Sequence, residues 1–160
     1  MEQSVSALAK ALLARRELLA TAESCTGGWV AKVCTDLPGS SGWFERGLVT
    51  YSNAAKRELL GVPAQTLEQY GAVSEQTVRE MVLGLLHSSH AQWGLAISGI
   101  AGPGGGTADK PTGTVWIAWA GPENWLITHS YRFAGDREAV RRQAVAAALG
   151  VLCDRLGGLA

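Results

Sequence analysis

The chain has 160 residues, of which 47% are hydrophobic and 18% charged, and its formal net charge is zero. A chain of this length buries roughly two-thirds of its unfolded surface, so we expect one ordinary domain covering residues 1–160. Zero net charge excludes a broad electrostatic surface for nucleic acid or an anionic membrane. No apolar run reaches about 18 residues and no signal peptide is visible, so we expect no membrane partner and a cytoplasmic protein.

The first half of the chain predicts helices that alternate with strands. Apolar residues at helical spacing indicate an opening helix that ends near Arg15 and Arg16. The elements expected next are a strand over 18–22, a helix over 29–35, a strand over 44–51, a helix over 54–60 and short helical turns over 63–70. We expect Asn53 to cap the helix over 54–60 and Gly61 to end it.

The second half predicts a long helix that begins after Ser74, then strands, then a final helix after Asp136. A buried strand over 95–97 leads into a glycine-rich loop, and strands over 115–120 and 126–133 form an antiparallel hairpin. The tryptophans in or beside these strands are expected to pack in the core or at a subunit contact. The order of elements predicts an α/β protein, a three-layer α/β/α sandwich with a mixed β-sheet.

Three loops concentrate small hydroxyl residues and glycines where strands are expected to end. They begin at Ser24, Tyr51 and Ser98. Ligands of open α/β sheets bind beyond the carboxyl ends of the strands, so we expect these loops to meet at one crevice. Thr26, Gly27 and Gly28 lead into a helix N-terminus, and they form either an anion-binding turn or an ordinary tight turn.

Lys56 is the most unusual residue of these loops. With Asn53 as the cap it lies in the first helical turn, where a positive charge opposes the helix dipole. If the side chain is also buried, its pKa falls, and a neutral amine near a serine is a general base. The alternative is an exposed lysine. The nearby Ser40 and Ser41 lie in a turn, and turns favour serine for reasons unrelated to catalysis.

Other reactive groups give weaker hypotheses. Cys25 stands at a helix N-terminus, which lowers the pKa of a thiol, but it has no evident base. His87 and His90 lie three residues apart, but no third ligand for a metal ion accompanies them. The chain has no G-x-S-x-G motif that would supply a nucleophilic serine to pair with His129. The three cysteines follow no CxxC spacing, so we expect reduced thiols and no metal site. No Walker A loop or dinucleotide fingerprint occurs either.

Seven short blocks carry a resemblance to a known family. They follow one another along the chain, at residues 21–28, 39–41, 49–53 with Lys56, 71–74, 98–103, 110–115 and 135–137. With these blocks the sequence resembles the CinA C-terminal domain family, whose standalone form is bacterial nicotinamide-nucleotide amidohydrolase. The resemblance implies hydrolysis of nicotinamide mononucleotide to nicotinate mononucleotide and ammonia in pyridine-nucleotide (NAD) salvage. It also implies a serine/lysine mechanism without cofactor or metal, on a fold that commonly forms a homodimer.

The resemblance also assigns roles to individual residues. Ser41 becomes the nucleophile, Lys56 the base that takes its proton and Tyr51 a residue that orients the pair, with Ser24 as a reserve nucleophile. The residues expected to contact substrate are Ser24, Thr26, Gly27, Gly28, Gly39, Ser98, Gly99 and Arg137. A second hypothesis is a nucleotide-binding or partner-binding module that has this fold but no turnover.

Overall fold

The computed structural model describes residues 1–157 and contains a five-stranded mixed sheet. The order of strands across the sheet is β2-β1-β3-β4-β5. Their bounds are β1 Leu19–Glu23, β2 Phe44–Val49, β3 Trp93–Gly99, β4 Thr114–Gly121 and β5 Trp125–Arg132. β1 pairs in parallel with β2 and β3, whereas β4 is antiparallel to both of its neighbours. The expected hairpin of the last two strands is confirmed.

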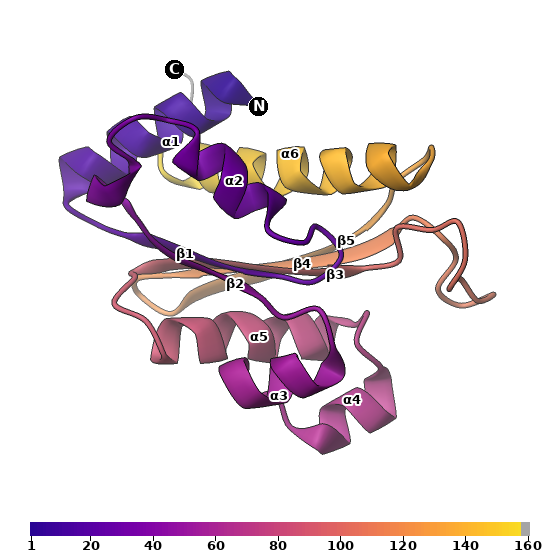
Figure 1. The fold of residues 1–160 in the computed structure, drawn as a ribbon. Helices are drawn as coiled ribbons and strands as arrows, with labels where there is room; N and C mark the ends of the chain where they lie inside the picture. Colours follow the sequence, from indigo (N-terminus) through magenta and orange to yellow (C-terminus); the bar gives the residue numbers. More distant parts are fainter. Residues whose placement is uncertain (158–160) are drawn as a thin grey trace.

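Helices cover both faces of this sheet (Figure 1). Their bounds are α1 Glu2–Arg15, α2 Trp29–Thr35, α3 Asn53–Leu60, α4 Ala64–Tyr70, α5 Glu75–His87 and α6 Arg137–Arg155, with a short 3-10 helix η1 at Ser40–Gly42. In Figure 1, α1, α2 and α6 lie on one side of the sheet and α3, α4 and α5 on the other. The predicted three-layer α/β/α sandwich is therefore confirmed.

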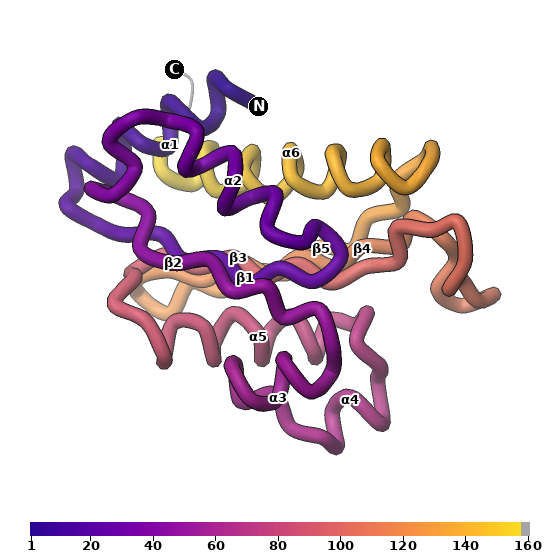
Figure 2. Tube along the Cα trace, in the orientation of Figure 1, coloured from indigo at the N-terminus to yellow at the C-terminus, as the bar shows by residue number. Residues whose placement is uncertain are grey.

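The hydrophobic core is divided by the sheet into two parts. The larger part lies under α1, α2 and α6 and contains the buried rings of Trp43 and Trp119. The smaller part packs α5 against the opposite face through Val78, Met81 and Val82. The tube in Figure 2 shows α1 beside the end of α6, where an Arg15 guanidinium N–H donates to the carbonyl of Leu156 at 3.1 Å.

The parallel part of the sheet brings three loops to one edge. Because β1, β2 and β3 run in the same direction, their carboxyl ends lie together, and the chain leaves them at Ser24, Thr50 and Ile100. β1 is buried along its whole length, which fixes it as the centre of this arrangement. The structure thus provides the common edge that the sequence predicts.

One helix cap differs from the expectation. Ser52, not Asn53, is the N-cap of α3, and its Oγ accepts a hydrogen bond from the Ala55 N–H at 3.0 Å. The cap one residue earlier places Lys56 at the start of the second turn, since its N–H makes the helical bond to the Ser52 carbonyl. The helix dipole therefore acts on Lys56 less than it would on a residue of the first turn. Gly61 ends the helix as predicted, with a φ of 67°.

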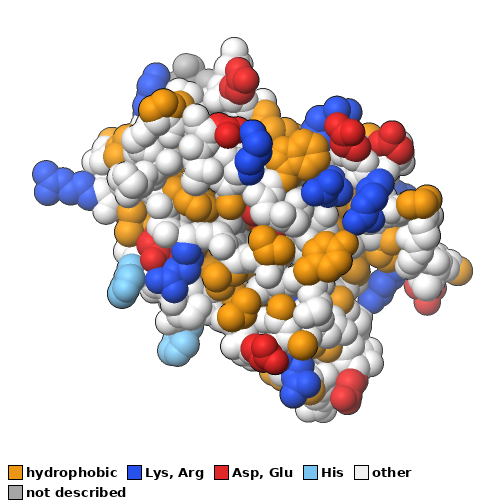
Figure 3. All heavy atoms as spheres, viewed as in Figure 1, with side chains coloured by type: hydrophobic (Ala, Val, Ile, Leu, Met, Phe, Trp, Pro, Cys, Tyr) orange, Lys and Arg blue, Asp and Glu red, His pale blue; other side chains and the backbone are white. Residues whose placement is uncertain are grey.

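The strand β2 forms one edge of the sheet and has exposed apolar side chains on or beside it. Val49 is 48% exposed and Tyr51 is 59% exposed. The surface in Figure 3, drawn in the orientation of Figure 1, shows apolar side chains gathered across the middle of the side of the molecule that faces the viewer. Within residues 1–157, none of the helices has the length and apolar composition that a bilayer crossing requires.

The position of α3 depends on a close approach of α5 at Gly84. A Cβ atom at this residue would collide with the carbonyl oxygen of Leu60, the last residue of α3. Gly150 in α6 is a matched contrast, because a Cβ there meets no atom within 4 Å.

We predict that Gly84→Ala lowers the free energy of unfolding by about 2–3 kcal/mol through overpacking. Gly150→Ala should raise it by about 0.5–1 kcal/mol, because alanine favours the helix. Urea denaturation followed by circular dichroism measures both values. Equal stability of the two variants would show that α3 and α5 do not pack this closely.

Candidate active site

The three loops at the carboxyl edge surround a cavity of about 210 Å³. The connection between α4 and α5 and the first turn of α6 complete its wall. Its lining residues are Ser24, Cys25, Tyr51, Lys56, Ala72, Val73, Ser98, Gly99, Ala101 and Arg137. Six of these residues were predicted from the sequence to be catalytic or to bind substrate. They are Ser24, Tyr51, Lys56, Ser98, Gly99 and Arg137.

Lys56 is buried at the base of this cavity, with 1% of its surface exposed. Its Nζ lies 2.7 Å from the carbonyl oxygen of Thr50, 3.2 Å from that of Tyr51 and 3.0 Å from Oγ of Ser24. Neither of the two ion pairs found among residues 1–157 includes Lys56. Lysine is rarely buried to this extent without a charged partner, so the ammonium form is disfavoured here.

Burial accordingly lowers the pKa of the Lys56 amine from 10.5 to about 8, and the nearby Cys25 has a smaller opposing effect. In the structure Lys56 Nζ donates to the two carbonyls and to Ser24 Oγ. When the amine loses one of its three protons, two N–H groups remain for the two carbonyls and the lone pair can face the Ser24 hydroxyl. This is the arrangement that a general base needs. The exposed-lysine alternative is wrong.

Ser24 stands directly after β1. Its N–H donates to the Ile97 carbonyl at 2.9 Å, and its carbonyl accepts from the Gly27 N–H at 3.0 Å. The backbone on both sides of the hydroxyl is thus held, and Oγ also lies 3.4 Å from the Tyr51 carbonyl. The strand and the tight turn together aim this serine at the amine of Lys56.

The structure does not bring Ser41 to Lys56. Ser41 is exposed in η1, which precedes β2, whereas Lys56 follows the same strand. A strand of six residues spans roughly 20 Å, so the two side chains lie at opposite ends of it. Gly39, the N-cap of η1, also precedes β2 and does not line the cavity. Within one chain, the predicted Ser41–Lys56 pair is replaced by Ser24–Lys56.

Thr26, Gly27 and Gly28 are also absent from the cavity lining. The N-terminus of α2 is already occupied, because the buried Glu23 carboxylate accepts from the Val30 and Ala31 N–H groups at 2.8 and 3.0 Å. The Thr26 hydroxyl donates to the same carboxylate at 2.8 Å. The Glu23 carboxylate therefore occupies the position at which the sequence predicted either a bound anionic ligand or an ordinary tight turn. Gly27 and Gly28 form the tight turn.

Tyr51 and Arg137 form the mouth of the cavity. One guanidinium N–H of Arg137 donates to the Tyr51 hydroxyl at 3.1 Å and another to the Gly102 carbonyl at 2.8 Å. The Tyr51 ring therefore faces Arg137, and it is the main-chain carbonyl of Tyr51 that contacts Lys56. Tyr51 supports the serine and lysine through its backbone rather than its phenol.

Ser98 and Gly99 lie at the end of β3 and line the cavity, as predicted. Ser98 is 1% exposed. Cys25 lies beside them, and burial raises the pKa of its thiol to about 11. A thiol with that pKa stays protonated near neutral pH, which argues against Cys25 as the nucleophile.

Two kinds of contribution were missed by sequence reasoning. Ala72 and Val73 line the cavity but carry no reactive group, and their only signal is their place in the block over 71–74. The carbonyl of Thr50 holds Lys56, and main-chain contacts of this kind leave no trace in the residue type.

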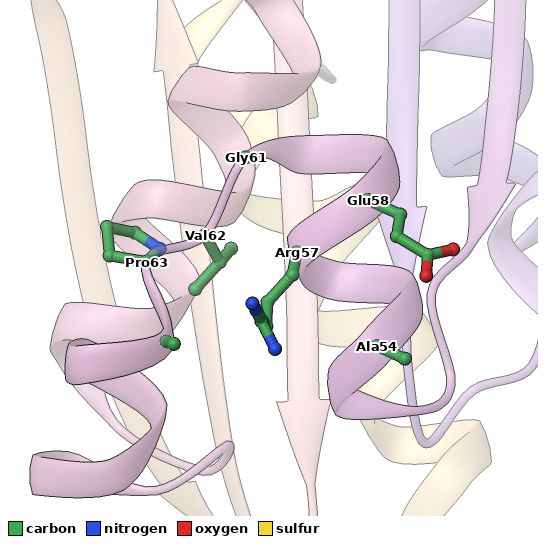
Figure 4. Close-up of a pocket in the computed structure, with 7 residues that line it drawn as sticks. Ala54, Arg57, Glu58, Gly61, Val62 and Pro63 are labelled. Carbon is green, nitrogen blue, oxygen red and sulfur yellow. The ribbon is translucent and has the colours of Figure 1, made fainter.

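A larger hollow of about 420 Å³ lies elsewhere, between α3 and the start of α4 (Figure 4). Arg57 points into it, toward the connection at Val62 and Pro63, and Glu58 points away. Both charged residues are exposed, and the remaining lining is small or apolar. Residues 1–157 contain no cluster of three or more His, Cys, Asp or Glu side chains that could hold a metal ion. The reactive groups thus gather at the smaller cavity.

Fold and site together define an α/β/α sandwich whose carboxyl-edge cavity holds a serine hydroxyl against a buried lysine amine. The sequence model of the CinA C-terminal domain matches residues 1–156. The chain belongs to the CinA C-terminal domain family.

Curated relatives include the nicotinamide-nucleotide amidohydrolase PncC of Enterobacter agglomerans, which is 60% identical over 84% of this chain and 82% of its own length. The protein of the same name from Escherichia coli is 58% identical over 89% and 87%. Among solved structures, the competence damage-inducible protein A of Klebsiella pneumoniae superposes with a TM-score of 0.93 at 42% identity, covering 98% of this chain and 96% of that one.

The titration of Lys56 gives a direct check of the site. In protein labelled with ¹⁵N-lysine, one Nζ signal should titrate with a midpoint near pH 8, because burial disfavours its charged form. The Lys56→Met variant should lack this signal and no other. If every lysine signal titrates near 10.5, the amine is not desolvated in solution.

Proposed function

We propose that this protein is an amidohydrolase that converts nicotinamide mononucleotide to nicotinate mononucleotide and ammonia. The observation that carries the proposal is the 3.0 Å separation between the buried Lys56 Nζ and Ser24 Oγ. The names of the similar proteins supply the substrate, and the geometry of the two groups supplies the reaction class.

The first half of the reaction forms an ester on Ser24. Neutral Lys56 takes the hydroxyl proton while Oγ attacks the carboxamide carbon, which gives a tetrahedral intermediate with a negative oxygen. Ser98 and Cys25 line the cavity beside Ser24, and we propose the Ser98 hydroxyl and the Cys25 main-chain N–H as the donors to that oxygen. The Lys56 ammonium then protonates the leaving nitrogen, ammonia departs, and the acyl group remains on Ser24.

The second half hydrolyses this ester. Lys56, neutral again, takes a proton from water, and the resulting hydroxide attacks the acyl carbon. The intermediate collapses, and Ser24 Oγ leaves with the proton that Lys56 returns. The product is released as the carboxylic acid, which gives its proton to solvent, where ammonia takes it up as ammonium. One amine thus serves as base and acid in turn, and the proton count closes over the cycle.

The cavity suits the carboxamide end of the substrate, with the phosphate outside it. Arg137 stands at the mouth, and a guanidinium has five N–H donors, of which the structure uses two. The remaining donors could bind a phosphate, which guanidinium groups recognise well. We therefore place the phosphate of nicotinamide mononucleotide at Arg137 rather than at the α2 N-terminus, which Glu23 occupies.

Several further expectations from chain length, composition and the family resemblance remain proposals. They are a single domain over residues 1–160, a role in pyridine-nucleotide salvage in the cytoplasm, turnover without cofactor or metal, and association of two chains. The exposed side chains of Val49, which ends the edge strand β2, and of Tyr51, which follows it, give the last proposal a candidate surface.

Ammonia release from nicotinamide mononucleotide by the purified protein tests this function. We predict that Ser24→Ala lowers kcat by about 10³-fold or more, since the nucleophile is lost. Lys56→Met should lower it by roughly 10²–10⁴-fold, since the base is lost. The matched controls, Ser41→Ala and Arg57→Met, remove an exposed hydroxyl and an exposed cation and should leave kcat near that of the wild type.

Two results would overturn parts of the proposal. Normal turnover by Ser24→Ala together with loss in Ser41→Ala would refute Ser24 as the nucleophile and leave the reaction class standing. Tight binding of the nucleotide by the wild-type protein without any ammonia would instead indicate a binding module.

A further inference from the structure

The three loops that form the cavity are all attached to α6 by two arginines. Arg137 and Arg141 are four residues apart and therefore lie on one face of the helix. Arg137 holds the loop after β2 at the Tyr51 hydroxyl and the loop after β3 at the Gly102 carbonyl. Arg141 holds the loop after β1, which carries Ser24. The function proposed above leaves Arg141 without a role, since it does not line the cavity.

Arg141 binds two successive carbonyls of that loop. Its Nε donates to the Cys25 carbonyl at 3.0 Å and its second terminal nitrogen to the Thr26 carbonyl at 3.1 Å. The guanidinium carbon lies 5.3 Å from the centre of the Trp29 ring, so the aromatic face supports the cation from the far end of the loop. A planar fork stacked on a ring has one orientation available, and it fixes both carbonyls at once.

These contacts reach Ser24 through a single peptide unit. The Thr26–Gly27 peptide has its carbonyl on Arg141, and its N–H donates to the Ser24 carbonyl at 3.0 Å. The carbonyl and N–H of a trans peptide point in opposite directions, so a group that fixes one fixes the other. The orientation of the Ser24 backbone is thereby coupled to the guanidinium of Arg141.

Glu23 holds the same loop from the other side. Its carboxylate accepts from the Thr26 hydroxyl at 2.8 Å, so Thr26 is bound at its side chain by Glu23 and at its carbonyl by Arg141. A loop held between an anion and a cation in this way has little freedom to rotate its peptides.

We propose that Arg141 is a positioning residue for the nucleophile: through the carbonyls of Cys25 and Thr26 it sets the direction of the Ser24 hydroxyl toward Lys56. The proposal rests on the hydrolase function described above. The proposal requires the two N–H donors of the Arg141 guanidinium, because two carbonyls at a fixed spacing need two donors at a matching spacing. A positive charge alone does not hold them in place.

The test compares Arg141→Gln, which removes the fork and the charge, with Arg141→Lys, which keeps the charge but offers no fork. Arg142→Gln is the matched control, because Arg142 is the next residue of α6 and is exposed. For each protein we would measure kcat and KM with nicotinamide mononucleotide, the melting temperature, and the rate at which a small fluorophosphonate labels Ser24.

Both Arg141 variants should lose roughly 10²-fold in kcat, the cost of misplacing a reacting group by about 1 Å. KM should stay within about threefold of the wild-type value, because no substrate contact is lost. The labelling rate of Ser24 should fall in parallel with kcat at temperatures well below melting, and Arg142→Gln should match the wild type. If Arg141→Gln does not fold, Arg141→Lys alone decides.

Retention of kcat by Arg141→Lys would overturn the proposal, since charge would then suffice. So would a change confined to KM, or a loss of kcat with Ser24 labelled at the wild-type rate. If the proposed hydrolase function is wrong, the wild-type protein will release no ammonia, and this result is distinct from the ones above. The labelling rates would still test whether Arg141 controls the reactivity of Ser24.

Discussion

The burial of one lysine amine beside one serine hydroxyl is the constraint on which the site depends. A shift of the Lys56 pKa from 10.5 to about 8 corresponds to about 3 kcal/mol of disfavour toward the ammonium form. The penalty is fully present below pH 8 and disappears above pH 10.5, because only in between does the folded protein bind fewer protons than the unfolded chain. The ammonium form of the buried Lys56 lowers the stability of the fold, and the neutral form has the lone pair that a general base requires.

The rest of the fold serves to hold this pair in place. Parallel pairing of β1 with β2 and β3 brings Ser24, the carbonyls of Thr50 and Tyr51, and Ser98 to one edge. The capped start of α3 turns Lys56 back toward that edge, and α5 packs against the end of α3 at Gly84. From the opposite layer, α6 reaches across with Arg137 and Arg141. The residues of the proposed mechanism thus come from the sheet and from both layers of helices.

Sequence reasoning located the elements well, because each has strong local signals: Ser74 and Asp136 are N-caps whose side chains accept the expected bonds, and Gly61 ends its helix. The rule that ligands bind beyond the carboxyl ends of strands also found the cavity. That rule alone would have selected Ser24, since Ser41 precedes its strand; the family resemblance led to Ser41 instead. The contacts of Glu23 and Arg141 could not be predicted, because both side chains bind backbone groups whose directions depend on the folded loop rather than on residue type.

The most direct measurement is the pH dependence of kcat/KM for ammonia release from nicotinamide mononucleotide. If a neutral Lys56 activates Ser24, kcat/KM should rise roughly tenfold per pH unit below the pKa of this amine and level off above about pH 8. A profile that stays flat from about pH 6 to about pH 9 would mean that no base of this pKa takes part. Activation of Ser24 by a buried, neutral Lys56 would then be contradicted.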